Sequence, residues 1–145
     1  MKNKIIVHCS DSPNFKDLSV DAIDKMHKAR GWRKIGYHFV IQPTGQVDVG
    51  RAISEVGAHT EGENSTSVGV CLIGRDRFTK AQFTALKELC NNLEKDAQIP
   101  RWAIYGHYEF KSAQKQGKTC PNIDKARLLA WILTGDETPL SIYME

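Results

Sequence analysis

The sequence has no long hydrophobic run. Its first apolar stretch, "IIV" at residues 5–7, is followed at once by His8, Ser10 and Asp11, whereas a secretion signal carries an apolar core of roughly 7 to 15 residues. No segment approaches the roughly 18 consecutive apolar residues that are typical of a membrane span. We therefore expect a chain that is made in the cytoplasm and does not insert into a membrane.

A dominant charge of one sign is also missing. The chain has 20 Lys and Arg residues against 17 Asp and Glu residues, which gives a net charge of +3 at pH 7. This mildly basic balance favours weak attraction to anionic surfaces without requiring it. Because no cluster of Lys and Arg is interleaved with aromatic residues, a nucleic-acid-binding groove is not expected.

Cysteine is scarce, with four residues in 145. Four cysteines permit two disulfides, but the expected reducing compartment favours free thiols. Cys9, Cys71 and Cys90 lie in apolar patterns, so we expect them to be small core residues. Cys120 lies outside any apolar run and is the candidate for a working thiol.

Strand-like and helix-like segments alternate along the chain, which predicts an α/β fold with a mixed central sheet flanked by about three helices. Strand patterns occur at residues 4–10, 36–42, 46–51, 68–74 and 102–109, and helix patterns at residues 19–31, 79–97 and 123–135. The unbroken apolar run at 68–74 is typical of a central strand that is covered on both faces. We expect a single domain over residues 1–135 and a C-terminal tail over residues 136–145.

The first helix is expected to begin after Ser19 as N-cap and to bury a stripe of Val20, Ile23 and Met26. His27 lies among lysines and an arginine, so we expect it on the solvated face of this helix. The second helix has a stronger signature, because Thr79 and Gln82 form a capping-box pattern at its start.

Lys118 and Cys120 occur together in the stretch "GKTCP". Pro121 biases the preceding residue toward an extended backbone, and residues i and i+2 of an extended chain project to the same side. The ammonium and the thiol are therefore predicted to face one small space.

Imidazole and thiolate together suit zinc, and catalytic zinc sites keep three protein ligands. His8 and His107 each lie near the carboxyl end of a predicted strand, where α/β sheets carry functional groups. Strand alternation turns His8 away from Cys9, so the histidine can face a cleft while the thiol packs inside. The hypothesis is a zinc ion held by Cys120 and two histidines. Spacing alone does not choose between His8, His38, His59 and His107. Structural histidines around an unused thiol remain the alternative.

Five blocks of the sequence occur in a fixed order: "IIVHCSDS", "GYHFVIQPTGQVDVGR", "VGAHTEGENSTSVGVCLIG", "YGHYE" and "GKTCP". Together they resemble the zinc-dependent N-acetylmuramoyl-L-alanine amidases that share a fold with the peptidoglycan recognition proteins, and in particular short bacteriophage endolysins. The resemblance extends from about Lys4 to Trp131. It implies the amidase/peptidoglycan-recognition-protein fold for this chain.

The resemblance also implies the site residues. The metal ligands of the family match His8, His107 and Cys120, which would hold one Zn²⁺ per chain, and the catalytic residues match Tyr37 and Lys118. The substrate-binding candidates, with Asn64 and Ser67 in a supporting rather than catalytic role, are His59, Asn64 and Ser67. Residues 107–120 form a longer segment than in the compact phage enzymes, so the assignment of Lys118 rests on its adjacency to Thr-Cys-Pro.

The implied activity is zinc-dependent hydrolysis of the amide bond between N-acetylmuramic acid and L-alanine in peptidoglycan. An endolysin without a signal would wait in the host cytoplasm and act on peptidoglycan after the membrane is permeabilised. We expect a monomer. Inhibition of the phage RNA polymerase, which one phage relative performs partly through an N-terminal arm, is not favoured, because only three residues precede the first expected strand. The alternatives are a non-catalytic peptidoglycan-binding module, a cytoplasmic wall-recycling amidase, and a hydrolase with Cys120 as nucleophile and His107 as base.

Overall fold

A computed structural model describes residues 1–144 of the chain. In this part of the chain the strands form one mixed five-stranded sheet in the order β3-β2-β4-β1-β5. The strands are β1 (Lys4–Cys9), β2 (Phe39–Ile41), β3 (Val47–Val49), β4 (Ser67–Leu72) and β5 (Ile104–Gly106). β4 pairs in parallel with both β1 and β2, β1 pairs in parallel with β5, and β3 is antiparallel to β2. The predicted α/β class and the central position of the apolar strand are confirmed.

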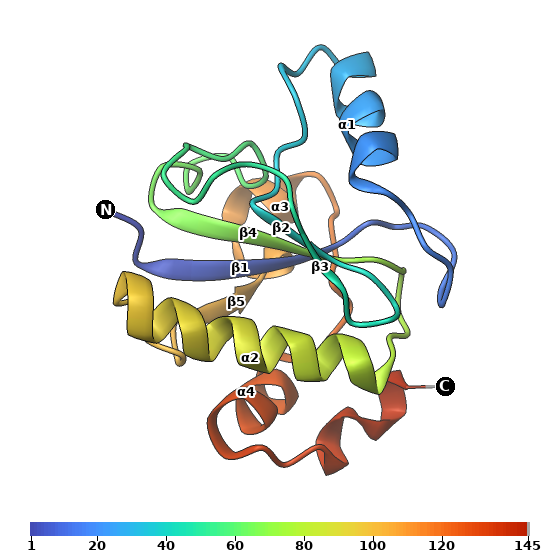
Figure 1. Ribbon diagram of the computed structural model, residues 1–145, viewed down its shortest axis with the longest axis vertical. Coiled ribbons are helices and arrows are strands. Elements are labelled where there is room, and N and C mark those ends of the chain that lie inside the picture. The colour runs from blue at the N-terminus through green and yellow to red at the C-terminus, as the bar shows by residue number, and fades with distance from the viewer. Residues whose placement is uncertain (145) are drawn as a thin grey trace.

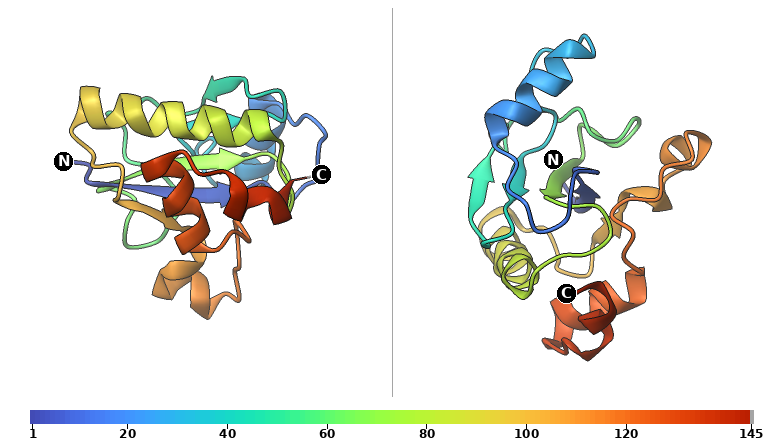
Figure 2. Two further views of the ribbon diagram at one scale, coloured as in Figure 1. Left: turned by 90° about the horizontal axis from the view of Figure 1, so that it is seen from below. Right: turned by 90° about the vertical axis from the view of Figure 1, so that its right-hand side faces the viewer.

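The helices are α1 (Val20–Ala29), α2 (Lys80–Ala97), α3 (Lys111–Lys115) and α4 (Lys125–Thr134), with two 3-10 helices, η1 (His107–Glu109) and η2 (Thr138–Tyr143). α2 and α4 lie together on one side of the sheet, and α1 lies on the other side (Figures 1 and 2). In residues 1–144, no helix combines the length and the hydropathy that crossing a bilayer requires.

The alternation of side chains along the strands gives the sheet two unlike faces. We call the side covered by α2 and α4 the apolar face; its strand residues include Ile5, Val7, Val68, Val70 and Leu72. We call the opposite side the histidine face; its strands carry His8, Ser67, Gly69 and Cys71. Both sets come from the same strands, because successive residues of a strand point to opposite faces.

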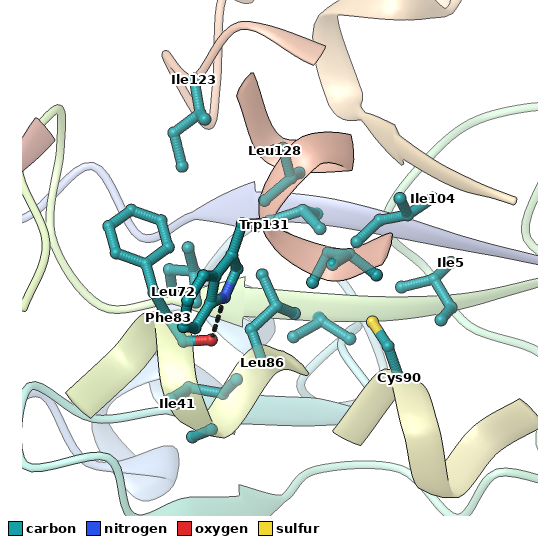
Figure 3. Close-up of a cluster of buried hydrophobic side chains, with 14 of the residues drawn as sticks. Ile5, Ile41, Leu72, Phe83, Leu86, Cys90, Ile104, Ile123, Leu128 and Trp131 are labelled. Atoms are coloured by element: carbon teal, nitrogen blue, oxygen red, sulfur yellow. Dashed lines mark hydrogen bonds between the residues drawn. The ribbon is translucent and has the colours of Figure 1, made fainter. Parts of the chain in front are cut away.

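The apolar face holds the main hydrophobic core, in which side chains from β1, β4 and β5 meet those of α2 and α4 (Figure 3). The Trp131 indole of α4 donates a hydrogen bond to the Phe83 carbonyl of α2 over 2.8 Å. This bond pairs the polar end of a buried aromatic side chain, which would otherwise be costly to desolvate. The predicted capping box of α2 is present, with Thr79 and Gln82 bonded reciprocally.

Residues 138–143, in the expected tail, fold as η2 and pack against this core. Leu140 is fully buried in the main cluster. The Tyr143 carbonyl accepts a hydrogen bond from the Phe78 amide over 2.7 Å, and the Tyr143 hydroxyl accepts one from the Asp124 amide over 2.9 Å. Residues 138–143 therefore add apolar contacts and backbone pairing to the same core.

The buried stripe of α1 differs from the prediction. Ile23 and His27 are buried, whereas Met26 is 42% exposed. His27 Nδ1 accepts a hydrogen bond from the Gly36 amide over 2.9 Å, and the His27 ring lies against the Trp32 ring with centroids 4.5 Å apart. The expectation of a solvated His27 was therefore wrong: residues i and i+4 share a helix face, so His27 follows Ile23 inward despite its charged neighbours.

Candidate metal centre and active-site cleft

Two histidines meet at the carboxyl ends of neighbouring parallel strands. Val7 of β1 is in register with Gly106 of β5, so the next residue of each chain segment, His8 or His107, emerges at the same edge of the sheet. The centroids of the two imidazole rings lie 4.3 Å apart. The predicted strand at 102–109 is shorter than expected, because β5 ends at Gly106 and His107 begins η1.

Cys120, at the end of the 107–120 segment, lies beside the start of that segment. The Tyr108 amide donates to the Cys120 carbonyl over 3.1 Å, and the Cys120 sulfur lies 3.4 Å from His107 Nδ1. One ligand atom each from His8, His107 and Cys120 lie within 4.8 Å of one another, and no other group of this kind occurs in residues 1–144. Two imidazoles and a thiolate are a donor set that fits a three-ligand zinc site.

The protonation of these groups also suits a metal. Burial lowers the pKa of His8 to about 4, so its ring is neutral near pH 7. The neighbouring Cys9 thiol, and then His107 and His8, lower the pKa of the Cys120 thiol. Metal binding requires neutral imidazole and deprotonated thiol, and this cluster favours both forms.

The three side chains open onto a cleft of about 700 Å³. This volume lies within the range of roughly 300 to 1,000 Å³ that is usual for small-molecule sites. Of the candidate site residues, the cleft is lined by His8, Tyr37, His59, Asn64, His107, Lys118 and Cys120. Seven of the eight positions expected from the sequence thus lie around one space, and Ser67 does not line it.

Tyr37 enters the cleft from the segment before β2. Its ring centroid lies 5.1 Å from that of His8 and 5.3 Å from that of His27. Burial raises the pKa of the Tyr37 hydroxyl well above its usual value, so the phenol is neutral near pH 7. A neutral phenol both donates and accepts hydrogen bonds.

Lys118 is held at the cleft by the long 107–120 segment, which folds as α3 and a short turn. The Lys118 amide donates to the Ala113 carbonyl of α3 over 2.9 Å, and Ala113 is buried. The Ser112 hydroxyl ties α3 to the opposite loop by donating to the Glu61 carbonyl over 3.0 Å. Of the three lysines in this segment, Lys118 lines the cleft, whereas Lys111 and Lys115 do not.

The three substrate-binding candidates occupy different depths. Asn64 Oδ1 accepts hydrogen bonds from the amides of His59 and Thr60, over 2.8 and 2.9 Å, and so shapes the loop at the cleft wall. Ser67 is fully buried, and its hydroxyl contacts His59 Nε2 over 3.2 Å. Ser67 therefore contacts His59 without lining the cleft, and the substrate-binding role expected of these three residues stays a prediction.

His38 and His59 do not belong to the candidate metal group. His38 is fully buried between backbone groups, with Nδ1 accepting from the Gly69 amide over 3.0 Å and Nε2 lying 2.8 Å from the Glu55 carbonyl. His59 contacts His8, a member of that group, with His59 Nδ1 lying 2.9 Å from His8 Nε2. Burial lowers the pKa of His59 to about 2, so this ring is neutral as well.

Several cleft residues were not predicted from the sequence. Arg30 and Trp32 follow α1 and line the cleft with Thr60, and so does Cys9. The Cys9 side chain packs in the main core, as predicted, but it also contacts the Cys120 thiol. The expectation that Cys9 points away from the cleft was therefore incomplete. Only Thr60 could have been found, because it directly follows His59 in "GAHTEG".

Comparison with known proteins decides what this site belongs to. The family model described as N-acetylmuramoyl-L-alanine amidase matches residues 2–123. The chain belongs to this family. The activity of the amidase is therefore hydrolysis of the amide bond that joins N-acetylmuramic acid to L-alanine in peptidoglycan, as the resemblance implied.

Individual relatives agree with this assignment. The amidase is 36% identical over 142 residues to an endolysin of Enterobacteria phage K11, which covers 92% of this chain and 87% of that protein. Its fold is similar to that of the N-acetylmuramoyl-L-alanine amidase LysC from Clostridium intestinale, with a TM-score of 0.70, 26% identity and coverage of 81% and 87% of the two chains. It is also similar to Drosophila PGRP-LB, with a TM-score of 0.69, 25% identity and coverage of 86% and 84%. The expected amidase/peptidoglycan-recognition-protein fold is confirmed.

Proposed function

We propose that the amidase performs this hydrolysis with one Zn²⁺ held by His8, His107 and Cys120. The observation that carries the proposal is the convergence of their ligand atoms within 4.8 Å at the cleft. When bound, zinc lowers the pKa of a coordinated water toward about 7 and polarises a carbonyl as a Lewis acid. Three protein ligands leave a fourth position for this chemistry.

Lys118 is proposed to stabilise the negative charge that develops on the carbonyl oxygen of the scissile amide. An amide is a poor electrophile, so a fixed positive charge near this oxygen lowers the barrier at little cost in reorganisation. The hydrogen bond from the Lys118 amide to Ala113 supports this role, because it anchors the residue beside Cys120. In this proposal Lys118 stabilises the transition state and is not a metal ligand.

Tyr37 is proposed to hold the attacking water or to take its proton. The neutral phenol can accept a hydrogen bond from the water, and its ring lies against the His8 ring. Tyr37→Phe keeps the ring and removes only the hydroxyl, so we expect zinc content to stay at the wild-type level while kcat falls. Turnover equal to that of the wild-type amidase would leave the hydroxyl without a chemical task.

The chief rival from another class is a module of the same fold that binds peptidoglycan without cleaving it. The family's non-catalytic recognition proteins typically lack the cysteine ligand, whereas Cys120 is present here and lies 3.4 Å from His107. A second rival uses Cys120 as nucleophile and His107 as base. The two enzyme mechanisms differ in their response to a chelator, because a thiol nucleophile does not need a metal.

The decisive experiment combines metal analysis with product analysis. Purified amidase is quantified for zinc, and digested peptidoglycan is examined by mass spectrometry. We expect about one Zn²⁺ per chain, release of stem peptides with a free L-alanine amine, loss of activity in chelator and recovery on adding Zn²⁺. Activity that persists in a metal-free protein would refute the zinc mechanism, and binding without release would favour the recognition module.

We further propose that the amidase serves as an endolysin, because its similarity to the phage K11 endolysin covers most of both chains. In this role it acts on peptidoglycan from the host cytoplasm after the membrane is permeabilised. Added to Gram-negative cells from outside, the amidase should lyse permeabilised cells and leave intact cells unaffected. Lysis of intact cells at the same rate would contradict this proposal.

A further inference from the structure

A chain of buried hydrogen bonds leads from the proposed ligand His8 into the sheet. His8 Nε2 lies 2.9 Å from His59 Nδ1, and His59 Nε2 lies 3.2 Å from the Ser67 hydroxyl. Ser67 Oγ lies 2.6 Å from the Glu63 carbonyl. The three side chains are buried, with exposed fractions of 2%, 8% and 0% for His8, His59 and Ser67. We propose that His59 and Ser67 are positioning residues that fix the ring tautomer of His8, so that its Nδ1 lone pair faces the metal; the inference rests on the proposed zinc site.

The far end of this chain sets its direction. A carbonyl oxygen only accepts hydrogen bonds, so the single Ser67 hydroxyl proton is committed to the Glu63 carbonyl. Ser67 Oγ must then accept from His59, which places the one N–H of the neutral His59 ring on Nε2. His59 Nδ1 is left as an acceptor, and the neighbouring His8 Nε2 must donate to it.

The Thr60 hydroxyl at the same point agrees with this direction. It lies 3.1 Å from His59 Nδ1 and 3.3 Å from His8 Nε2. A hydroxyl can donate to the first atom and accept from the second, so it accommodates an unprotonated His59 Nδ1 and a protonated His8 Nε2. With Nε2 protonated, the neutral His8 ring offers Nδ1 as its only lone pair for a metal.

The His59 ring also lies in a socket that only glycines permit. A Cβ added at Gly69 would lie 2.5 Å from His59 Cδ2, and one added at Gly57 would lie 2.6 Å from the same atom. Any side chain at either glycine would push the ring out of its place, because real Cβ contacts are not this short. Gly69 of the sheet and Gly57 of the loop thus hold the His59 ring in the position from which it bonds to both His8 and Ser67.

Groups that hydrogen-bond to metal-ligating histidines fix ring orientation and raise ligand basicity, and their loss typically lowers metal affinity or activity by 10- to 100-fold. Ser67→Ala removes the acceptor for His59 Nε2–H and leaves the metal ligands unchanged. The His59 proton can then move to Nδ1, which would force the His8 proton onto the nitrogen that faces the metal. We expect Ser67→Ala to weaken Zn²⁺ binding by about 10- to 100-fold.

The test measures the Kd for Zn²⁺ by competition with a chromophoric chelator in wild-type amidase, Ser67→Ala and Thr79→Ala. Thr79→Ala is the matched control, because it removes a part-buried hydroxyl that caps α2 and does not line the cleft. We expect the control to lower Tm but to keep the wild-type Kd. At saturating Zn²⁺, Ser67→Ala should keep the wild-type KM for a muropeptide, because Ser67 is fully buried and does not line the cleft.

A second measurement needs no variant. Nitrogen-15 NMR of the histidine rings in the wild-type amidase should place the His59 proton on Nε2 and the His8 proton on Nε2. A wild-type Kd in Ser67→Ala, a raised KM with unchanged Kd, or a His59 proton on Nδ1 would each overturn the inference alone. Failure of the wild-type amidase to bind Zn²⁺ would instead refute the proposed function on which the inference rests.

Discussion

The two faces of the sheet are built from the same strands and do different work. On the apolar face, alternate residues of β1 and β4 meet α2 and α4 in the main hydrophobic core. On the histidine face, the intervening residues meet a smaller cluster under α1 and a set of buried imidazoles that ends at the cleft. The apolar face stabilises the fold through non-directional burial of apolar surface. The histidine face provides directional hydrogen bonds and a candidate metal ligand, His8.

The difference teaches where function is placed in this fold. Burying apolar surface contributes roughly 25 cal/mol per Å². This contribution depends on area and not on direction, so apolar side chains do not each require one specific partner. A buried polar group costs free energy unless each of its atoms has a partner. The histidine face meets this demand through backbone and side-chain pairing, and the candidate ligand atoms of His8, His107 and Cys120 lie within 4.8 Å of one another at the cleft. Changes on the two faces should therefore be separable.

The largest expected effect comes from removing one metal ligand. Cys120→Ala should lose both bound Zn²⁺ and amidase activity, because two imidazoles alone make an incomplete catalytic zinc site. Zinc analysis and muropeptide cleavage measure the two losses. Cys90→Ala on the apolar face is the matched control, since Cys90 is fully buried in the core. It should keep both properties and lose only stability. Retained zinc in Cys120→Ala would break the comparison.

A smaller effect is expected from the charge that serves the transition state. Lys118→Ala should keep Zn²⁺ while kcat falls by a factor on the order of 10² to 10³, as for loss of an oxyanion-stabilising donor. Lys115→Ala is the control, because Lys115 belongs to the same segment and does not line the cleft. Equal turnover in wild-type amidase and Lys118→Ala would show that this lysine has no part in the reaction.

The apolar face should respond in the opposite way. Leu140 of η2 is fully buried in the core, so Leu140→Ala should reduce the free energy of unfolding by about 2 to 5 kcal/mol. Zn²⁺ affinity and kcat should remain at wild-type values below the unfolding temperature. Urea denaturation measures the first quantity. A loss of less than about 0.5 kcal/mol, the usual size of a surface effect, would mean that residues 136–145 act as a dispensable tail.

The two faces also differ in how far the sequence predicts them. Apolar periodicity and caps identify α2, α4 and the central strand, because each signal is local: Thr79 with Gln82, or Leu128 with Trp131 and Ile132. The ligand set required the family resemblance, because His8, His107 and Cys120 meet only through strand register and the path of the 107–120 segment. Local composition gave the wrong environment for one buried histidine, since a paired imidazole has no pattern of its own.

That misplaced residue, His27, gives the mildest test. Burial and the nearby Arg30 lower the pKa of His27 to about 4, whereas an unfolded histidine has a pKa near 6.5. Between these values the unfolded chain binds a proton that the folded chain does not. The stability that His27 contributes is therefore present above about pH 6.5 and is lost as the pH falls toward about 4. Protonation would also end the acceptance of the Gly36 hydrogen bond at Nδ1.

Because His8, His38 and His59 also have lowered pKa values, the share of His27 is isolated by comparing wild-type amidase with His27→Asn, each without metal. The Asn carboxamide oxygen can accept from the Gly36 amide and does not titrate. The Tm of the variant should fall less steeply than that of the wild-type amidase as the pH is lowered. Parallel Tm profiles would mean that His27 is solvated in solution. The buried position of His27 and its hydrogen bond to the Gly36 amide would then be wrong.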